Sequence, residues 1–187
     1  MRPPEIIETP RLALRPPMLA DAEEIFAGYA QDAEVAKYMI WRPHKNIEET
    51  RDFIRRCVSA WEDGSTYPWI IAQKEDGRLV GMIESRVKGF SMDIGYVLAR
   101  TYWGRGYMPE AARPVVDWGL SQDGIFRVWA LCDVDNSASA RVMEKIGMRR
   151  EGILRRWIIH PNLSDEPRDV YCYSAVDRKS TRLNSSH

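Results

Sequence analysis

Residues 100–111 read RTYWGRGYMPEA, and this stretch decides the fold of the chain. It follows a strand-like run that ends at Ala99, and it leads into residues with helical spacing. The first N–H groups of a helix have no partner within the helix and carry partial positive charge. Gly104 and Gly106 let the backbone approach an anion closely, and Arg105 adds a full positive charge. The stretch therefore predicts a phosphate-binding loop at a helix N-terminus.

The spacing of this loop excludes the two commonest nucleotide-binding motifs. A Rossmann fingerprint needs a third glycine three residues after Gly106, where this sequence has Pro109. A Walker A loop needs Gly-Lys-Ser/Thr, which the stretch lacks. Pro109 instead suits the first helical turn, where its missing N–H costs nothing. Because two glycines also occur in ordinary turns, the ligand class stays open on these residues alone.

Composition narrows the class of protein. A chain of 187 residues predicts a single domain, placed at residues 1–177. Lys plus Arg (27) balance Asp plus Glu (27), which argues against a nucleic-acid or anionic-membrane binder. The three cysteines are odd in number and far apart, so we expect reduced core thiols in a cytoplasmic protein. The polar segment 178–187 is expected to be a non-native or disordered tail.

Metal and membrane roles are not expected either. The three histidines have no Cys or His partner at metal-ligand spacing, so the sequence predicts no metal. The chain has no apolar run long enough to span a bilayer and no signal-peptide pattern at its start.

Hydrophobic periodicity predicts an alternation of strands and helices. Strands are expected at 12–15, 69–73, 79–87, 93–99, 126–132, 148–160 and 169–174. Helices are expected to start near Asp21, Asn46, Tyr107 and Asp135, the first two with capping-box spacing. The helix from Tyr107 contains Pro114 and is expected to end at Gly119 or Gly124. Short turns join three central strands into an antiparallel meander, and this helix then crosses over to a parallel strand.

Four local patterns together resemble one family. They are Glu8-Thr9-Pro10-Arg11-Leu12, Ile94-Gly95-Tyr96, Tyr102-Trp103-Gly104-Arg105-Gly106-Tyr107-x-x-Glu110-Ala111, and Asn136-x-x-Ser139-x-x-x-Met143-Glu144-Lys145-x-Gly147-Met148. In combination the chain resembles the GNAT superfamily of acyl-CoA-dependent N-acetyltransferases, closest to the ribosomal-protein N-terminal acetyltransferase (RimJ/RimL-like) branch. The resemblance implies an α/β (α+β) GNAT fold. Its mixed, mostly antiparallel sheet of about seven strands would carry helices on both faces and splay between the fourth and fifth strands.

The same resemblance implies acetyl-CoA as co-substrate and assigns residues to it. The glycine loop would hold the pyrophosphate, and the strand edge and the next helix would contact pantetheine. The assigned residues are Val97, Leu98, Trp103, Gly104, Arg105, Gly106, Tyr107, Met108, Asn136 and Ser139. Asn136 also suits a plain helix N-cap. Thr101 departs from the Arg or Gln of the family loop.

The resemblance implies three catalytic candidates, Ser139, Asp93 and Glu84. Many family members have a tyrosine as acid where this chain has Met143, and a serine at the place of Ser139 is thought to hydrogen-bond the CoA sulfur. A peptide α-amine has a pKa of ~8, so about a tenth is neutral at pH 7 and only modest base assistance is needed. Asp93 is the first candidate for that base and Glu84 the second, although Glu84 also fits an exposed strand carboxylate.

The expected function is transfer of an acetyl group from acetyl-CoA to a primary amine by direct attack in a ternary complex. The acceptor would be a protein N-terminal α-amine or a small molecule, and the aromatic loop 38–43 and segment 157–168 would shape its pocket. An antibiotic-modifying acetyltransferase, a non-catalytic acyl-CoA sensor on the same fold, and an unrelated phosphate-ligand protein are alternatives. Neither nucleic acid nor membrane is expected as a direct partner, and a homodimer stays open.

Overall fold

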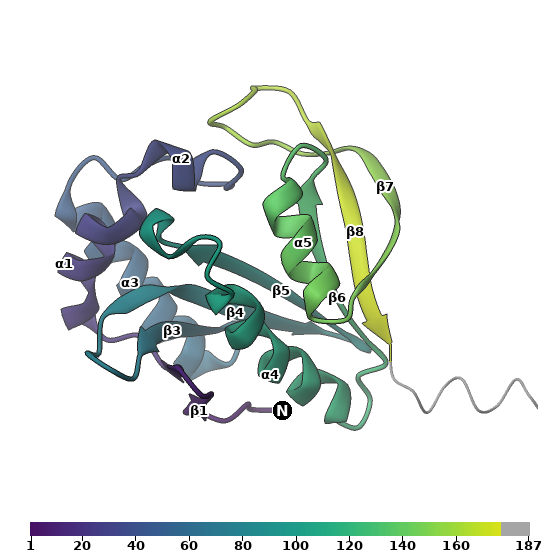
Figure 1. The fold of residues 1–187 in the computed structure, drawn as a ribbon, viewed down its shortest axis with the longest axis horizontal. Coiled ribbons are helices and arrows are strands. Elements are labelled where there is room, and N and C mark those ends of the chain that lie inside the picture. Colours follow the sequence, from purple (N-terminus) through teal and green to yellow (C-terminus); the bar gives the residue numbers. More distant parts are fainter. Residues whose placement is uncertain (177–187) are drawn as a thin grey trace, which may run out of the picture.

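The computed structural model describes residues 1–176, which form one mixed sheet with helices against both of its faces (Figure 1). The strands are β1 (Ile7–Glu8), β2 (Leu12–Arg15), β3 (Tyr67–Gln73), β4 (Leu79–Lys88), β5 (Ser91–Leu98), β6 (Arg127–Asp133), β7 (Arg149–Ile158) and β8 (Arg168–Val176). Their order in the sheet is β1-β2-β3-β4-β5-β6-β8-β7. The predicted tail, 178–187, lies outside the described residues. The fold class is confirmed, with an eighth strand because the short β1 pairs with β2.

The helices are α1 (Ala22–Ile25), α2 (Ala33–Ala36), α3 (Ile47–Asp63), α4 (Tyr107–Ser121) and α5 (Ser137–Lys145). Shorter helical segments are η1 (Leu19–Asp21), η2 (Phe26–Ala30) and η3 (Arg100–Tyr102). The capping box predicted at Asp21 is wrong, because this carboxylate accepts from Arg15 at 2.7 and 2.9 Å and from the backbone N–H of Met18 at 2.7 Å. The carboxylate of Asp21 is thus engaged by Arg15 and Met18 rather than as a cap, while the chain stays helical through the consecutive segments η1, α1 and η2.

Apolar side chains fill both faces of the sheet. Successive residues of a strand point to opposite faces. Ile70 therefore packs with α1 and α3, while Ile71 packs with α4, and both are fully buried. Figure 1 shows α3 on one side of β3 and β4, with α4 and α5 on the other. This double covering holds the central strands rigid around the site.

The sheet splays where β5 meets β6. These two strands are parallel and pair at three positions, from Ser91 with Arg127 to Asp93 with Trp129. Beyond Asp93, β5 continues to Leu98 beside β4, while β6 continues to Asp133 beside β8. The predicted splay between these strands is confirmed, and it opens a gap in the middle of the sheet.

Helix α4 carries Pro114 in its interior and ends at Ser121. The expected helix end at Gly119 or Gly124 is wrong, because Gly119 lies inside the helix. A Cβ on Gly119 would lie 2.3 Å from Cε of Met92 and 3.0 Å from a methyl group of Val128. This glycine is therefore a site of close helix–sheet packing rather than a helix terminator.

Candidate active site

The glycine loop joins β5 to α4 through η3. Gly104 has φ +74° and Gly106, the N-cap of α4, has φ +76°, both in the left-handed region that favours glycine. A Cβ on Gly104 would meet no atom within 4 Å, and one on Gly106 would meet only Nη2 of Arg11, at 3.6 Å. The backbone at the start of α4 is therefore open to a ligand, as an anion site requires.

The N-terminal segment holds this loop in place. Glu110, in the first turn of α4, accepts from Oγ1 of Thr9 at 2.7 Å, and from the backbone N–H and Nε of Arg11 at 2.8 and 2.6 Å. Arg11 also donates to the carbonyl of Arg105 at 3.0 Å, and its guanidinium lies 4.4 Å from the ring centre of Tyr107. Burial by itself would raise the pKa of Glu110, but these hydrogen bonds lower it, and the net result is a decrease. The pattern at residues 8–12 and the glycine-loop pattern at residues 102–111 therefore form one hydrogen-bonded unit.

A cavity of about 520 Å³ runs from this loop to the start of α5. Of the residues assigned to the cofactor, those that line it are Val97, Leu98, Trp103, Gly104, Gly106, Tyr107, Met108, Asn136 and Ser139. Arg105 does not line it: its guanidinium lies 5.9 Å from the ring centre of Tyr102.

The strand edge beside this cavity is less free than expected. The carbonyl of Leu98, assigned to pantetheine, accepts from Nε1 of Trp103 at 2.8 Å. The Val97 carbonyl approaches Gly81 so closely that a Cβ there would lie 2.2 Å from its oxygen. Gly81 is therefore needed for β4 to pack beside this edge.

The start of α5 brings Asn136 and Ser139 to the gap. Asn136 caps the helix, because its Oδ1 accepts from the backbone N–H of Ser139 at 3.1 Å. Oγ of Ser139 lies 2.8 Å from the hydroxyl of Tyr96, a β5 residue that was not assigned to the site from the sequence. Burial raises the pKa of Tyr96, against the opposing hydrogen bond to Ser139, so the phenol stays protonated at neutral pH.

Neither Met143 nor Cys132 can act as a catalytic group here. Met143, at the place of the family tyrosine, is fully buried in the core. Cys132 lies at the gap, but burial, reinforced by the charge of Asp133, raises the pKa of its thiol to about 12. A neutral thiol is a weak nucleophile, so the site contains no activated cysteine.

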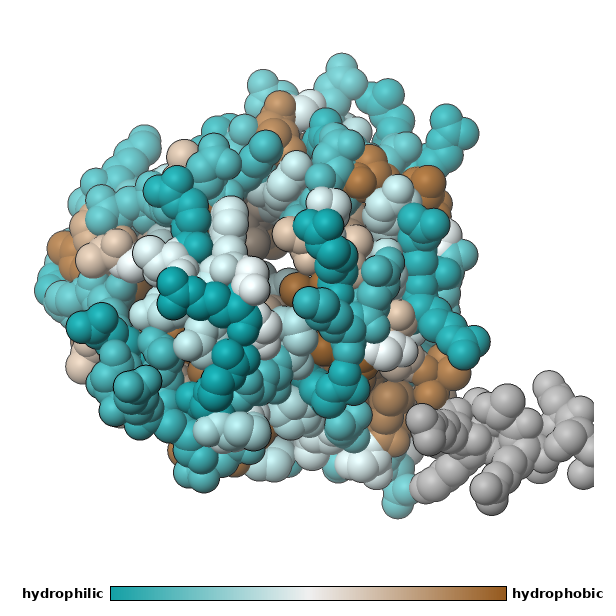
Figure 2. Space-filling view, viewed as in Figure 1, coloured by the Kyte–Doolittle hydropathy of each residue, from teal (hydrophilic) through white to brown (hydrophobic). Residues whose placement is uncertain are grey.

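A second cavity, of about 570 Å³, opens on the other side of Ser139. Residues 38–41 of the predicted aromatic loop line it, together with Ile158 and His160 from the predicted segment 157–168. Residues that line both cavities are Tyr38, Met39, Tyr96, Val97, Asn136 and Ser139. Figure 2 shows the surface hollowed beside α5, near the middle of the molecule, with apolar side chains inside the hollow.

The two predicted carboxylates lie in this second cavity with an arginine between them. Arg86 donates to Oε1 of Glu84 at 2.6 Å and to Oδ2 of Asp93 at 2.8 and 2.6 Å. Burial by itself would lower the pKa of Arg86, but the two carboxylates raise it, and the net result is an increase. Both carboxylates therefore already have a hydrogen-bond partner within the protein. The roles of Asp93 and Glu84 as bases stay predictions, and sequence analysis missed Arg86, whose position opposite Asp93 follows from the strand register.

The described part of the chain contains no group of three His, Cys, Asp or Glu side chains that could hold a metal ion. The three cysteines are free and buried, as expected. Within residues 1–176, no helix is both long and apolar enough to cross a membrane.

Comparison with known proteins agrees with this geometry. Residues 11–149 match the acetyltransferase (GNAT) domain. The uncharacterized N-acetyltransferase YoaA of Bacillus subtilis (strain 168) is 32% identical over 174 residues, covering 91% of this chain and 96% of its own.

Two solved structures share the fold at lower identity. The microcin C7 self-immunity acetyltransferase MccE, in complex with acetyl-CoA and AMP, has a TM-score of 0.83 at 24% identity, covering 93% of this chain and 97% of its own. The ribosomal alpha-N-protein acetyltransferase RimL, in complex with coenzyme A, has a TM-score of 0.81 at 20% identity, covering 92% and 98%. With a domain match over most of its length and a relative above 30% identity, this chain belongs to the GNAT family of N-acetyltransferases.

Proposed function

We propose that this acetyltransferase transfers the acetyl group of acetyl-CoA to a primary amine by direct attack, with both substrates bound at once. The observation that carries the proposal is the pair of cavities that meet at Tyr96, Asn136 and Ser139. One cavity ends at the glycine loop, and the other ends among aromatic and charged side chains. Two substrates bound from opposite sides would have their reacting groups at this meeting point, where proximity supplies much of the rate.

The donor cavity suits a CoA thioester. Its far end offers the open backbone of Gly104 and Gly106 at the N-terminus of α4, which is a site for pyrophosphate. Its near end lies along the splayed part of β5, where the Leu98 carbonyl is already bonded to Trp103, so pantetheine would pair with other backbone groups of this strand or replace that bond. In our proposal the thioester lies at Ser139, which lines both cavities.

Ser139 and Tyr96 suit the departing thiolate. The Tyr96 phenol stays protonated and can donate to Oγ of Ser139, which frees the serine hydroxyl proton for the sulfur. A hydrogen bond to a developing charge is stronger in the transition state than in the ground state, so it accelerates the step. This pair would take the place of the tyrosine that Met143 replaces.

The acceptor cavity suits a primary amine next to an apolar or aromatic group. Tyr38, Trp41 and Phe53 contribute aromatic surface, while Glu84 and Asp93 contribute negative charge that attracts an ammonium group. The volume of about 570 Å³ fits a small molecule or the first residues of a peptide. The similarity to RimL, a ribosomal alpha-N-protein acetyltransferase, favours a protein α-amine as acceptor, and the similarity to MccE, a microcin C7 self-immunity acetyltransferase, keeps an antibiotic acceptor as the alternative.

The test has two stages. Melting temperature is first measured with acetyl-CoA, with CoA and with ATP; we expect the two CoA species to raise it and ATP to leave it unchanged. Release of free CoA thiol is then followed across a panel of α-amino peptides, lysine peptides, polyamines and amine antibiotics. A CoA-dependent shift without thiol release from any amine would indicate a sensor, and the absence of a shift would refute CoA binding altogether.

A further inference from the structure

His160 lies just past the end of β7, and it lines the acceptor cavity. The residue is 4% exposed, and neither ring nitrogen has a hydrogen-bond partner among the described residues. A buried polar group without a partner costs about 1–3 kcal/mol. Native structures pair most such groups, so exceptions need an explanation. Both ring nitrogens are buried in the wall of a substrate cavity, and Nδ1 has neither a hydrogen bond nor an ion-pair partner, so we infer that a ligand supplies its missing hydrogen bond.

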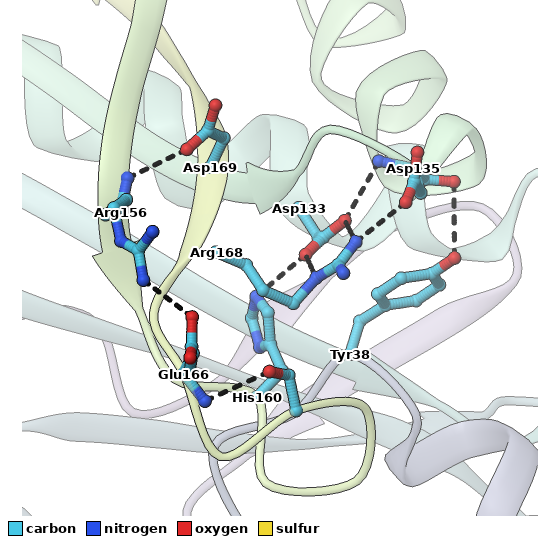
Figure 3. Close-up of polar contacts among 9 residues, drawn as sticks. Tyr38, Asp133, Asp135, Arg156, His160, Glu166, Arg168 and Asp169 are labelled. Atoms are coloured by element: carbon cyan, nitrogen blue, oxygen red, sulfur yellow. Dashed lines mark hydrogen bonds and ion pairs between the residues drawn. The ribbon is translucent and has the colours of Figure 1, made fainter.

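The imidazole is held beside a carboxylate that is itself fixed. Nε2 of His160 lies 3.6 Å from Oδ2 of Asp133, the last residue of β6 (Figure 3). Arg168 donates to Oδ2 and Oδ1 of Asp133 at 2.6 and 3.0 Å, and the backbone N–H of Asp135 donates to Oδ1 at 2.9 Å. Burial opposes ionisation, but these contacts lower the pKa of Asp133. A fixed negative charge beside Nε2 favours the tautomer protonated there, which leaves the lone pair on Nδ1.

The backbone of His160 is fixed as well. Its carbonyl accepts from the backbone N–H groups of Leu163 and Ser164 at 2.8 and 3.0 Å. The ring of Tyr38 stands edge-on to the imidazole, with 6.4 Å between ring centres. The side chain is therefore oriented from three sides by β6, β8 and the loop after α2, as Figure 3 shows for Asp133, Arg168 and Tyr38.

The surrounding groups keep this imidazole neutral at physiological pH. Burial lowers the pKa of His160, the charge of Asp133 raises it, the charge of Arg168 lowers it again, and a weaker contribution from the backbone of Met39 raises it, with a net decrease. Other charged groups on the cavity wall are Glu84, Arg86 and Asp93. A neutral histidine oriented by a carboxylate is the usual form of a general base.

We propose that His160 is the proton acceptor for the substrate amine, with Asp133 as its positioning residue. This inference rests on the proposed function, and it assigns the base to a residue other than the arginine-bound Asp93 and Glu84. In the step, the amine nitrogen forms a bond to the thioester carbon while its proton passes to Nδ1 of His160. The C–S bond then breaks, and sulfur leaves as a thiolate hydrogen-bonded by Ser139. The imidazolium returns its proton to solvent, and the thiolate takes one up.

A base with a pKa below the ordinary value of about 6.5 is adequate for this step. The free ammonium of a peptide, with a pKa of ~8, would not yield its proton readily to it. The nitrogen of the tetrahedral adduct is far more acidic than the free ammonium, so transfer from the adduct is favourable. The neutral fraction of the amine therefore attacks, and His160 acts as the new bond forms.

The pH profile of the unmodified enzyme gives the first test. With an α-amine acceptor, log(kcat/KM) rises with slope one below the amine pKa, because only neutral amine reacts. We expect this slope to steepen to two at acidic pH, where His160 also becomes protonated. A slope of one at every pH at which the enzyme stays folded would overturn the proposal without any variant.

Variants give the second test. For His160→Gln we expect kcat/KM to fall about 100-fold, with the slope at one throughout and the acetyl-CoA-induced shift in melting temperature unchanged. His44→Gln is the matched control, because His44 bonds Oγ1 of Thr50 at 2.7 Å and does not line the cavity. In His160→Ala, added imidazole should restore part of kcat. Activity within twofold of the parent in His160→Gln, or no rescue by imidazole, would assign His160 a purely structural role.

The two proposals fail in different ways. If the parent enzyme acetylates no amine in the panel, the proposed function fails, whatever His160 does. If the parent acetylates an amine while His160→Gln keeps its rate and its pH profile, only the assignment of His160 fails.

Discussion

The donor and acceptor sides of this molecule are built in different ways. The donor side is formed mainly by two continuous segments, the loop that enters α4 and the start of α5, with residues 34–39 and the end of β5 completing its wall. In the proposed function its main binding groups belong to the backbone. The acceptor side collects side chains from eight separate elements: the loop after α2, helices α3 and α5, and strands β4, β5, β6, β7 and β8. In the proposed function, the common co-substrate would therefore be bound by local geometry, and the variable acceptor by dispersed side chains.

The difference follows from what each ligand requires. A pyrophosphate accepts hydrogen bonds from any N–H group, so glycines that expose the backbone are sufficient and side chains matter little. An acceptor has a particular shape and charge, which side chains must match. Substitutions in the glycine loop should thus affect binding of every CoA species alike, whereas substitutions in the acceptor cavity should affect turnover and choice of amine.

The largest effect is expected for Gly106→Val. This change places a β-branched side chain at φ +76°, which costs about 1–3 kcal/mol in strain, and it blocks the start of α4. We expect the affinity for acetyl-CoA to fall by at least about 100-fold, equivalent to roughly 2.8 kcal/mol. Isothermal titration with acetyl-CoA and with CoA measures it.

Gly124→Val is the matched control for that strain. Gly124 has φ +88° and open space around it, but it follows the far end of α4. The control should lose stability to a similar extent and keep its affinity for acetyl-CoA. Equal affinity in both variants would show that the glycine loop does not bind the pyrophosphate.

The donor side was largely predictable from the sequence because its determinants are local. Left-handed glycines, a proline in the first helical turn and an asparagine cap each act within a few residues of their own helix start, so their patterns can be recognised in the linear chain. Arg105 is the one assigned residue that does not line the donor cavity: its guanidinium lies 5.9 Å from the ring centre of Tyr102, and its role as a phosphate ligand stays a prediction. The direction of a loop side chain depends on tertiary packing, which spacing does not reveal.

A smaller effect is expected for Ser139→Ala. Removing the hydroxyl removes one hydrogen bond to the thiolate, which we expect to cost about 1.4 kcal/mol and to lower kcat about tenfold. Acetyl-CoA affinity should be kept, because the variant retains the backbone N–H of residue 139, which donates to Oδ1 of Asn136 and holds the start of α5. Steady-state kinetics together with a direct binding measurement separates the two quantities. An unchanged kcat would remove Ser139 from the mechanism.

The acceptor side was only partly predictable. The loop 38–43 and segment 157–168 were expected at the pocket, and both contribute to it. Arg86 was not expected there, and His160 was expected only as part of segment 157–168 without a role, because their roles depend on strand register and on a turn that places His160 against Asp133. Such long-range placement leaves no periodic signal in the sequence. Tyr96 is intermediate: it stands in a recognised pattern, but its contact with Ser139 joins positions 43 residues apart.

The smallest effect is expected for Arg11→Gln, which tests how far the donor side depends on the N-terminal segment. Arg11 joins Glu110 to the carbonyl of Arg105, but its side chain is 46% exposed, so solvent screens the pair. An exposed pair contributes about 0.2–1 kcal/mol, so acetyl-CoA affinity should weaken about fivefold at most. Arg78→Gln is the control, since Arg78 pairs with Asp76 in a distant turn. A loss as large as that of Gly106→Val would mean that the N-terminal segment, rather than the glycines, determines the shape of the loop.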